Sequence, residues 1–220
     1  MHKRSVTILF IIFISLPALK FRCYKEPTPR PFDHNFEAAV DIFPVKKTYS
    51  LTDTIWIETD LPTKFLFDTK ISQSILADTG NMSFGAGFNE FGTYITNPPN
   101  GFCDIITLNG VNINRVLSHW ASSVTVNNFS CNRPDYKYRI GFKPNHKGTF
   151  HLSLPKDIFF ESCPNKIVPY YALISFKYKN IDLGRDIFDA LSKNDKGGND
   201  GIKFYHQAID ERRFFVFKVN

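Results

Sequence analysis

The tripeptide Asp78-Thr79-Gly80 is the part of this sequence with the most direct chemical meaning. Three apolar residues, Ile75-Leu76-Ala77, precede it, and the segment Leu183-Gly184-Arg185-Asp186 follows much later in the chain. Two aspartates held close together can share a proton and activate a water molecule, because each charge shifts the pKa of the other. Asp78 is therefore a candidate catalytic residue for hydrolysis, with the second aspartate supplied by another copy of the chain.

Both segments resemble those of retroviral-type aspartic peptidases, which combine an Asp-Thr-Gly turn with a downstream apolar-Gly-Arg-Asp segment. The resemblance implies a dimeric peptidase that works best in acid. Two residues depart from the family pattern: Asn81 follows the turn in place of a small or hydroxyl residue, and Asp182 puts a charge beside Leu183. Asp-Thr-Gly is also favourable turn chemistry in its own right. We therefore keep the peptidase as an alternative function.

Other common catalytic and metal-binding motifs do not occur in the sequence. There is no Gly-x-Ser-x-Gly, no P-loop and no Gly-x-Gly-x-x-Gly. The six histidines are scattered, without the spacing of a zinc site. The segment 194–201 (NDKGGNDG) lacks the alternating oxygen ligands and closing glutamate of a calcium loop. We expect no metal site and no cofactor.

The first 22 residues have the build of a secretory signal peptide: a basic head, an apolar run from Val6 to Leu16, and a break at Pro17-Ala18. The apolar run is shorter than the roughly 20 residues that span a bilayer. We expect a signal peptide at 1–22, a proline-rich arm at 23–35 and a single domain at 36–220. The mature protein would then lie in the periplasm, on the outer-membrane surface or outside the cell.

Export makes disulfide bonds the expected state of the cysteines. Cys103, Cys131 and Cys163 are the disulfide candidates, and together with Cys23 they allow three pairings that the sequence does not distinguish. Cys23 is also a candidate for lipidation, which would tether the protein to a membrane as an envelope scaffold. Its preceding residues, Lys20-Phe21-Arg22, differ from the small and apolar residues of a bacterial lipobox.

The basic charge of the chain comes largely from the signal. The full sequence has 27 basic and 21 acidic residues, a net charge of +6. Four of the basic residues and none of the acidic ones lie in residues 1–23, so the remainder carries +2. Basic residues elsewhere form no run longer than a pair, whereas a nucleic-acid interface needs a clustered basic face. We expect no nucleic-acid partner, and a membrane contact only through a lipid on Cys23.

Strand patterns recur along the rest of the chain, and the clearest lies at 136–154. Apolar residues alternate with polar ones over 136–142 and again over 150–154, on either side of a Gly-containing loop. This pattern predicts a β-hairpin with one buried face. Irregular strands and an ordered loop are expected over the Gly-rich stretch 80–101. Further strands are predicted at 36–43, 54–58, 64–67, 102–108, 168–178 and 213–219.

Apolar residues at near-helical spacing predict one helix over 181–191, with a further helical turn in 201–209. Strands in succession with a small late helical insert favour a mainly β fold, an antiparallel β-sandwich. Cys103, Trp120 and Cys163 have a spacing similar to the cysteine-tryptophan-cysteine pattern of immunoglobulin domains, although Glu161 replaces the tyrosine expected two residues before the last cysteine. The sandwich is therefore immunoglobulin-like at best.

The mature chain resembles uncharacterised exported proteins of Bacteroidota, with Asp53-Thr54-Ile55-Trp56-Ile57 as the local point of similarity. The resemblance implies no particular activity. We expect a non-catalytic binding or structural module of the cell envelope, whose ligand is another envelope protein, a peptide or a glycan. Its candidate ligand surface consists of aromatic residues, which anchor interfaces and stack on sugars, unless these rings pack the core instead: Phe84, Phe88, Phe91 and Tyr94.

Overall fold

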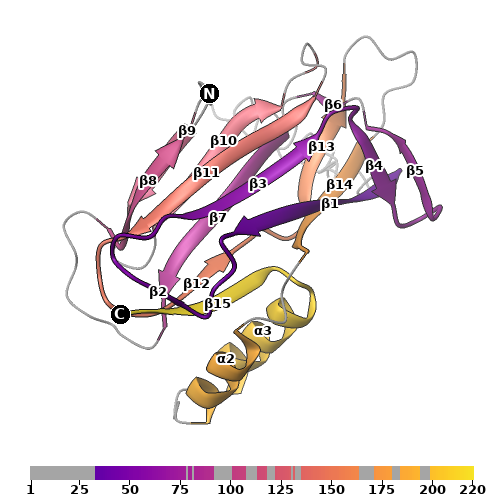
Figure 1. The fold of residues 1–220 in the computed structure, drawn as a ribbon. Coiled ribbons are helices and arrows are strands. Elements are labelled where there is room, and N and C mark those ends of the chain that lie inside the picture. Colours follow the sequence, from indigo (N-terminus) through magenta and orange to yellow (C-terminus); the bar gives the residue numbers. More distant parts are fainter. Residues whose placement is uncertain are drawn as a thin grey trace, which may run out of the picture. The chain divides into compact units, whose positions relative to one another are not determined.

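The computed structural model describes residues 33–77, 79–80, 82–91, 101–107, 113–117, 122–129, 131, 135–163, 171–179, 184–193 and 199–220. Most of these residues form strands (Figure 1). The strands are β1 (His34–Phe43), β2 (Thr48–Tyr49), β3 (Ile55–Leu61), β4 (Phe65–Asp68), β5 (Gln73–Leu76), β6 (Thr79–Gly80), β7 (Met82–Glu90), β8 (Cys103–Thr107), β9 (Ile113–Leu117), β10 (Ser122–Phe129), β11 (Tyr136–Pro144), β12 (Gly148–Ser153), β13 (Ile158–Ser162), β14 (Tyr171–Tyr178) and β15 (Phe214–Val219). The helices are α2 (Arg185–Ser192) and α3 (Asn199–Asp210).

The strands form two sheets. The first has nine strands in the order β6-β13-β14-β1-β3-β11-β8, with the β4–β5 pair joined to β1. The second has six strands in the order β2-β15-β12-β7-β10-β9. Pairing is antiparallel except between β1 and β14 and between β15 and β2. The predicted mainly β, antiparallel sandwich is therefore confirmed, with two parallel pairs added.

Aromatic side chains from both sheets fill the space between them. Phe84 of β7 stacks on Tyr138 of β11, with ring centroids 4.1 Å apart, and meets Phe176 of β14 edge-on at 4.8 Å. Phe88 of β7 stacks on Phe142 of β11 at 6.0 Å. All five rings are at most 1% exposed. The high aromatic content thus provides the thickness of the core.

The hairpin predicted over 136–154 does not form, although both of its strands do. β11 pairs with β3 and β8 in the nine-stranded sheet, whereas β12 pairs with β7 and β15 in the six-stranded sheet. The alternation of apolar and polar residues shows which face of a strand is buried, but it does not show which other strand pairs with it. The two apolar faces meet across the core instead of side by side.

The disulfide corrects the immunoglobulin comparison. Cys163 pairs with Cys131, 32 residues earlier, and Cys103 is a buried residue of β8 outside that bond. In the Gly-rich stretch, where irregular strands and a loop were expected, residues 82–90 form the strand β7, and its pairing with β10 contains a register shift. Residues 92–100 of this stretch lie outside the described residues. The strands β2, β5, β9, β10 and β13 had no counterpart among the sequence-based expectations.

The late helices were expected and form a second, smaller apolar cluster with β15, which Figure 1 shows beside the helix pair. Gly184 begins α2 with a φ of 102°, and an added Cβ would lie 2.0 Å from the carbonyl oxygen of Val216. Only glycine fits this close approach of helix to strand. Neither helix among the described residues is long and apolar enough to cross a membrane.

Glu211, at the end of α3, ties the helix pair to the sandwich. It accepts hydrogen bonds from Lys156 at 2.9 Å, Gln207 at 2.8 Å and Arg213 at 2.7 Å. Burial alone would raise the pKa of Glu211, but these hydrogen bonds outweigh it and lower the pKa to about 2. The stabilisation by this carboxylate is complete above its unfolded pKa and is lost as the pH falls towards 2.

We expect Glu211→Gln to lower the free energy of unfolding by about 1 kcal/mol at pH 7, after allowance for solvent screening. The stability of variant and wild type should converge as the pH falls towards 2, because the wild-type carboxylate is then protonated. Thermal unfolding followed by circular dichroism from pH 7 to pH 2 measures this difference. Asp104→Asn, which removes an exposed carboxyl on β8, is the control. A constant gap between Glu211→Gln and wild type at every pH would contradict the assignment.

Candidate functional site

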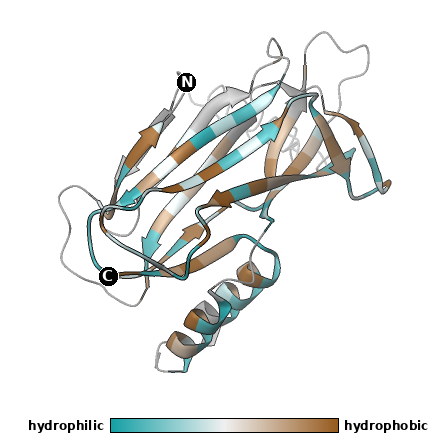
Figure 2. Ribbon diagram, viewed as in Figure 1, coloured by the Kyte–Doolittle hydropathy of each residue, from teal (hydrophilic) through white to brown (hydrophobic). Residues whose placement is uncertain are grey.

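Large exposed apolar side chains are concentrated on the hairpin formed by β4 and β5. Six such side chains are exposed among the described residues, and four belong to this hairpin: Phe65 (52%), Phe67 (44%), Ile71 (47%) and Leu76 (46%). We call these four residues the hairpin patch. Figure 2 shows the apolar colouring of β4 at the edge of the nine-stranded sheet. Single exposed apolar residues are common on soluble proteins, but clusters mark interaction sites.

The alternation of β4 explains why its phenylalanines face outward. Leu66 and Asp68 point inward and are at most 1% exposed, so Phe65 and Phe67 lie on the opposite face. β4 pairs with β1 through Phe36–Asp68 and Glu37–Phe67, which aligns Phe67 with the outer face of the sheet. The patch is therefore part of this outer face.

A buried carboxylate holds the far end of β4 against β1. Asp68 accepts hydrogen bonds from Nδ1 of His34 at 2.6 Å and from the backbone N–H groups of Asn35 and Lys70 at 3.2 and 2.9 Å. Burial alone would raise the pKa of Asp68, but these hydrogen bonds outweigh it and hold the pKa below its usual value. The carboxylate thus stays ionised and fixes the register of the strand.

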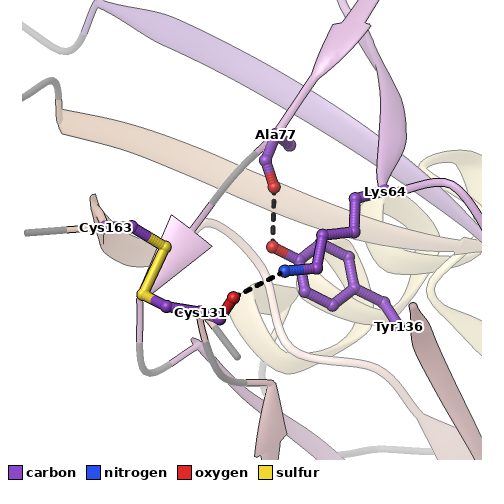
Figure 3. The surroundings of a disulfide bond; sticks show 5 residues. All are labelled: Lys64, Ala77, Cys131, Tyr136 and Cys163. Atoms are coloured by element: carbon purple, nitrogen blue, oxygen red, sulfur yellow. Dashed lines mark hydrogen bonds between the residues drawn. A yellow bond between two sulfur atoms is a disulfide. The ribbon is translucent and has the colours of Figure 1, made fainter. Parts of the chain in front are cut away.

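The base of the hairpin is held beside the disulfide, as Figure 3 shows. The backbone N–H of Ala77 donates to the carbonyl of Lys64 at 2.9 Å, and the hydroxyl of Tyr136 donates to the carbonyl of Ala77 at 2.6 Å. Lys64 is only 5% exposed. Its ammonium group lies 5.0 Å from the centroid of the Tyr136 ring and donates a hydrogen bond to the carbonyl of Cys131 at 3.5 Å. These contacts hold the ends of β4 and β5 in place beneath the hairpin patch.

A second aromatic group lies on the same outer face, on β1, β3 and β11. The guanidinium carbon of Arg139 is 4.6 Å from the ring centroid of Phe43 and 4.8 Å from that of Trp56. We call these three residues the arginine stack. Phe43 and Trp56 face each other across β1 and β3, and Gly141 lies opposite Trp56 on β11. An added Cβ on Gly141 would lie 2.9 Å from the indole ring, so glycine lets this ring lie against the sheet.

Cross-strand ion pairs occupy the outer face between and around these two groups. Lys177 binds Glu37, Lys179 binds Asp41 at 2.5 Å, and Lys137 binds Asp60 at 2.9 Å. Pairs this exposed contribute little to stability. Their charges cancel locally, so the apolar and aromatic groups distinguish this face: the hairpin patch, the arginine stack and, on β13, the exposed Phe159 stacked on Tyr171.

Of the four aromatic residues singled out from the sequence, the three that the structure describes do not lie on the outer face of the nine-stranded sheet. Phe84 and Phe88 are 0% exposed, so they pack the core and do not form the ligand surface proposed for them. Phe91 is half-buried against His151 and the helix residues Phe188 and Tyr205. Tyr94, Asp78 and Cys23 lie outside the described residues.

The hairpin patch was not predicted from the sequence, although the strand that carries Phe65 and Phe67 was predicted. The segment Phe65-Leu66-Phe67 was predicted as a strand, but three consecutive apolar residues do not show which of them faces solvent. Asp68 is the informative neighbour, because its burial beside His34 sets the facing of the strand. In the parts of the chain that are described, no three His, Cys, Asp or Glu side chains gather as metal ligands.

A shallow hollow of about 280 Å³ lies on the outer face of the other sheet, over β7, β10 and β12. Gly85 and Gly87 form its floor, with Ser123 and Thr125 on β10. Asn89 donates to the hydroxyl of Ser153 at 3.3 Å, and that hydroxyl donates to the carbonyl of Gly87 at 3.3 Å. The side chains of Asn89 and Ser153 thus make hydrogen bonds within the hollow itself.

Comparison with known proteins does not assign a family. No family model matches the sequence, and no curated protein matches it either. Among solved structures, the chain is similar to a cohesin module from a family 33 glycoside hydrolase of Clostridium perfringens, with a TM-score of 0.30 and 11% identity. The match covers 64% of this chain and 98% of the cohesin module. The β-sandwich assignment rests on the strand pairing described above.

Proposed function

We propose that this chain is an exported, non-catalytic module of the cell envelope that binds a protein partner through the outer face of its nine-stranded sheet. The observation that carries the proposal is the hairpin patch, where four large apolar side chains are 44–52% exposed on one short hairpin. Keeping such groups in water costs free energy that a partner removes by covering them.

The composition of the face supports a protein ligand. Aromatic residues and arginine are enriched in protein interfaces, and they carry most of the binding energy there. The hairpin patch supplies the apolar centre, and the exposed ion pairs would form a polar rim. The hydrogen bonds of Asp68 and Tyr136 hold the hairpin in place, so little conformational entropy is lost when a partner binds.

The test uses a library of random twelve-residue peptides displayed on phage, selected on the folded protein. We expect the selected peptides to be rich in apolar residues and to bind Phe65→Ser/Phe67→Ser at least about tenfold more weakly than wild type, because two anchors are lost. Kd values from biolayer interferometry measure the change.

The matched control is Phe204→Ser, which removes a phenylalanine that is 52% exposed on α3 instead of on the sheet. It should bind the selected peptides as the wild type does. Selection of no peptides, or equal binding to the Phe65/Phe67 variant, would refute the hairpin patch as the binding surface. Circular dichroism of all three proteins verifies that they are folded.

A further inference from the structure

Arg139 has unused hydrogen-bonding capacity on the same outer face. Its nearest acidic neighbour is Glu58, whose carboxylate oxygen is 3.9 Å from Nε and so beyond hydrogen-bond distance. The Nε atom is buried and makes no hydrogen bond, and none of the described residues accepts one from the terminal nitrogens. The side chain is nevertheless 39% exposed, so part of the guanidinium reaches solvent.

The two rings of the arginine stack prepare this guanidinium for one kind of ligand. Phe43 and Trp56 both pack within 5 Å of its central carbon, which restricts its rotation and removes water around it. A guanidinium held in this way presents a planar set of N–H donors that matches the two oxygens of a carboxylate. Because the side chain is already ordered, binding costs less entropy than it would for a mobile lysine.

We infer that the protein partner places the carboxylate of an aspartate or glutamate on Arg139 while its apolar residues cover the hairpin patch. This inference rests on the proposed function and specifies the chemistry of its partner. Charge complementarity supports it: Lys137, Lys177 and Lys179 bind acidic residues at 2.9 Å or less, whereas Arg139 has only a 3.9 Å ion pair with Glu58 and no hydrogen bond to any described residue.

The strand register also predicts how far apart the acidic residue and the apolar residues of the partner lie. Phe67 pairs with Glu37 of β1, and Arg139 is level with Asp41 of β1 through Glu58 of β3, four residues further along, which corresponds to about 13 Å of strand. An extended partner segment would therefore carry its acidic residue roughly four positions from its apolar anchors. A twelve-residue peptide is long enough to reach both groups.

The experiment uses the same peptide library and compares wild type, Arg139→Gln, Arg139→Lys and Lys143→Gln. Lys143 is an exposed cation on the same strand, so its variant removes an equal charge without disturbing the arginine stack. We expect the peptides selected on wild type to be enriched in acidic residues at the stated spacing. Their affinity should fall about tenfold or more in Arg139→Gln, fall less in Arg139→Lys, and stay unchanged in Lys143→Gln.

A double-mutant cycle separates direct recognition from a structural effect. Changing the acidic residue of a selected peptide to its amide should weaken binding to wild type but cause no further loss with Arg139→Gln. Peptides that depend on Phe65 and Phe67 yet carry no acidic enrichment, or that bind Arg139→Gln as tightly as wild type, would overturn this inference and leave the proposed function standing. Binding that is independent of Phe65 and Phe67 would refute the proposed function itself.

Discussion

Replacement of Phe84 by alanine is expected to lower the free energy of unfolding by about 3–5 kcal/mol. Phe84 lies on the inner face of β7 and contacts rings from two strands of the opposite sheet, Tyr138 at 4.1 Å and Phe176 at 4.8 Å. It is 0% exposed, so its removal leaves a cavity between the sheets. The rigid strands on both sides cannot close this space, and both the burial energy and the packing contacts are lost.

Chemical denaturation in urea, followed by circular dichroism, measures the effect of Phe84→Ala as a lower transition midpoint at an unchanged slope. Phe65→Ala is the matched control, because it deletes the same atoms from a ring that is 52% exposed. The control should change stability by about 0.5 kcal/mol or less. Equal effects of the two substitutions would contradict the placement of Phe84 in the core, and with it the sandwich.

Removal of the Cys131–Cys163 disulfide is expected to cost roughly 4 kcal/mol. The bond closes a loop with a sequence separation of 32 residues, and without it the unfolded chain gains the corresponding conformational entropy. The bond also lies beside the hairpin base, because the carbonyl of Cys131 accepts a hydrogen bond from the buried Lys64. We therefore expect local loosening at β4 and β5 in addition to the global loss.

The double variant Cys131→Ala/Cys163→Ala, compared with wild type in urea unfolding, measures this loss. Reduction of the wild type with dithiothreitol is the control, since it should lower the stability of the wild type to that of the variant and leave the variant unchanged. Hydrogen exchange should show faster exchange of the Ala77 amide, which donates to Lys64, in the variant. A variant as stable as wild type would show that the bond does not constrain the chain.

Alternation and helical spacing predicted most of the strands and the first of the two helices. The strands at 36–43, 54–58 and 213–219 match β1, β3 and β15 to within a few residues. β1 and β3 each have one buried face and a period of two, whereas β15 is a short apolar run that is buried on both faces. The helix predicted over 181–191 is confirmed by α2, and the helical turn expected in 201–209 is part of a longer helix, α3. Strands such as β10 were missed because polar residues dominate them: SSVTVNNF.

The sequence by itself determined that the chain is mainly β, with apolar faces on most strands and a late helical insert. It did not determine which strands pair. Two strands show the same period-two alternation whether they are hydrogen-bonded neighbours in one sheet or face each other from two sheets across the core. Only the tertiary structure placed β11 and β12 in different sheets and joined Cys163 to Cys131.

Exposure of the aromatic residues was also decided only in three dimensions. Phe84 and Phe65 are chemically identical and both lie in strands, yet one is 0% and the other 52% exposed. The difference arises from contacts between distant segments: Asp68 with His34 sets the facing of β4, and Phe43 with Trp56 encloses Arg139. Local sequence determines which residues alternate, whereas long-range packing determines which of them a partner can reach.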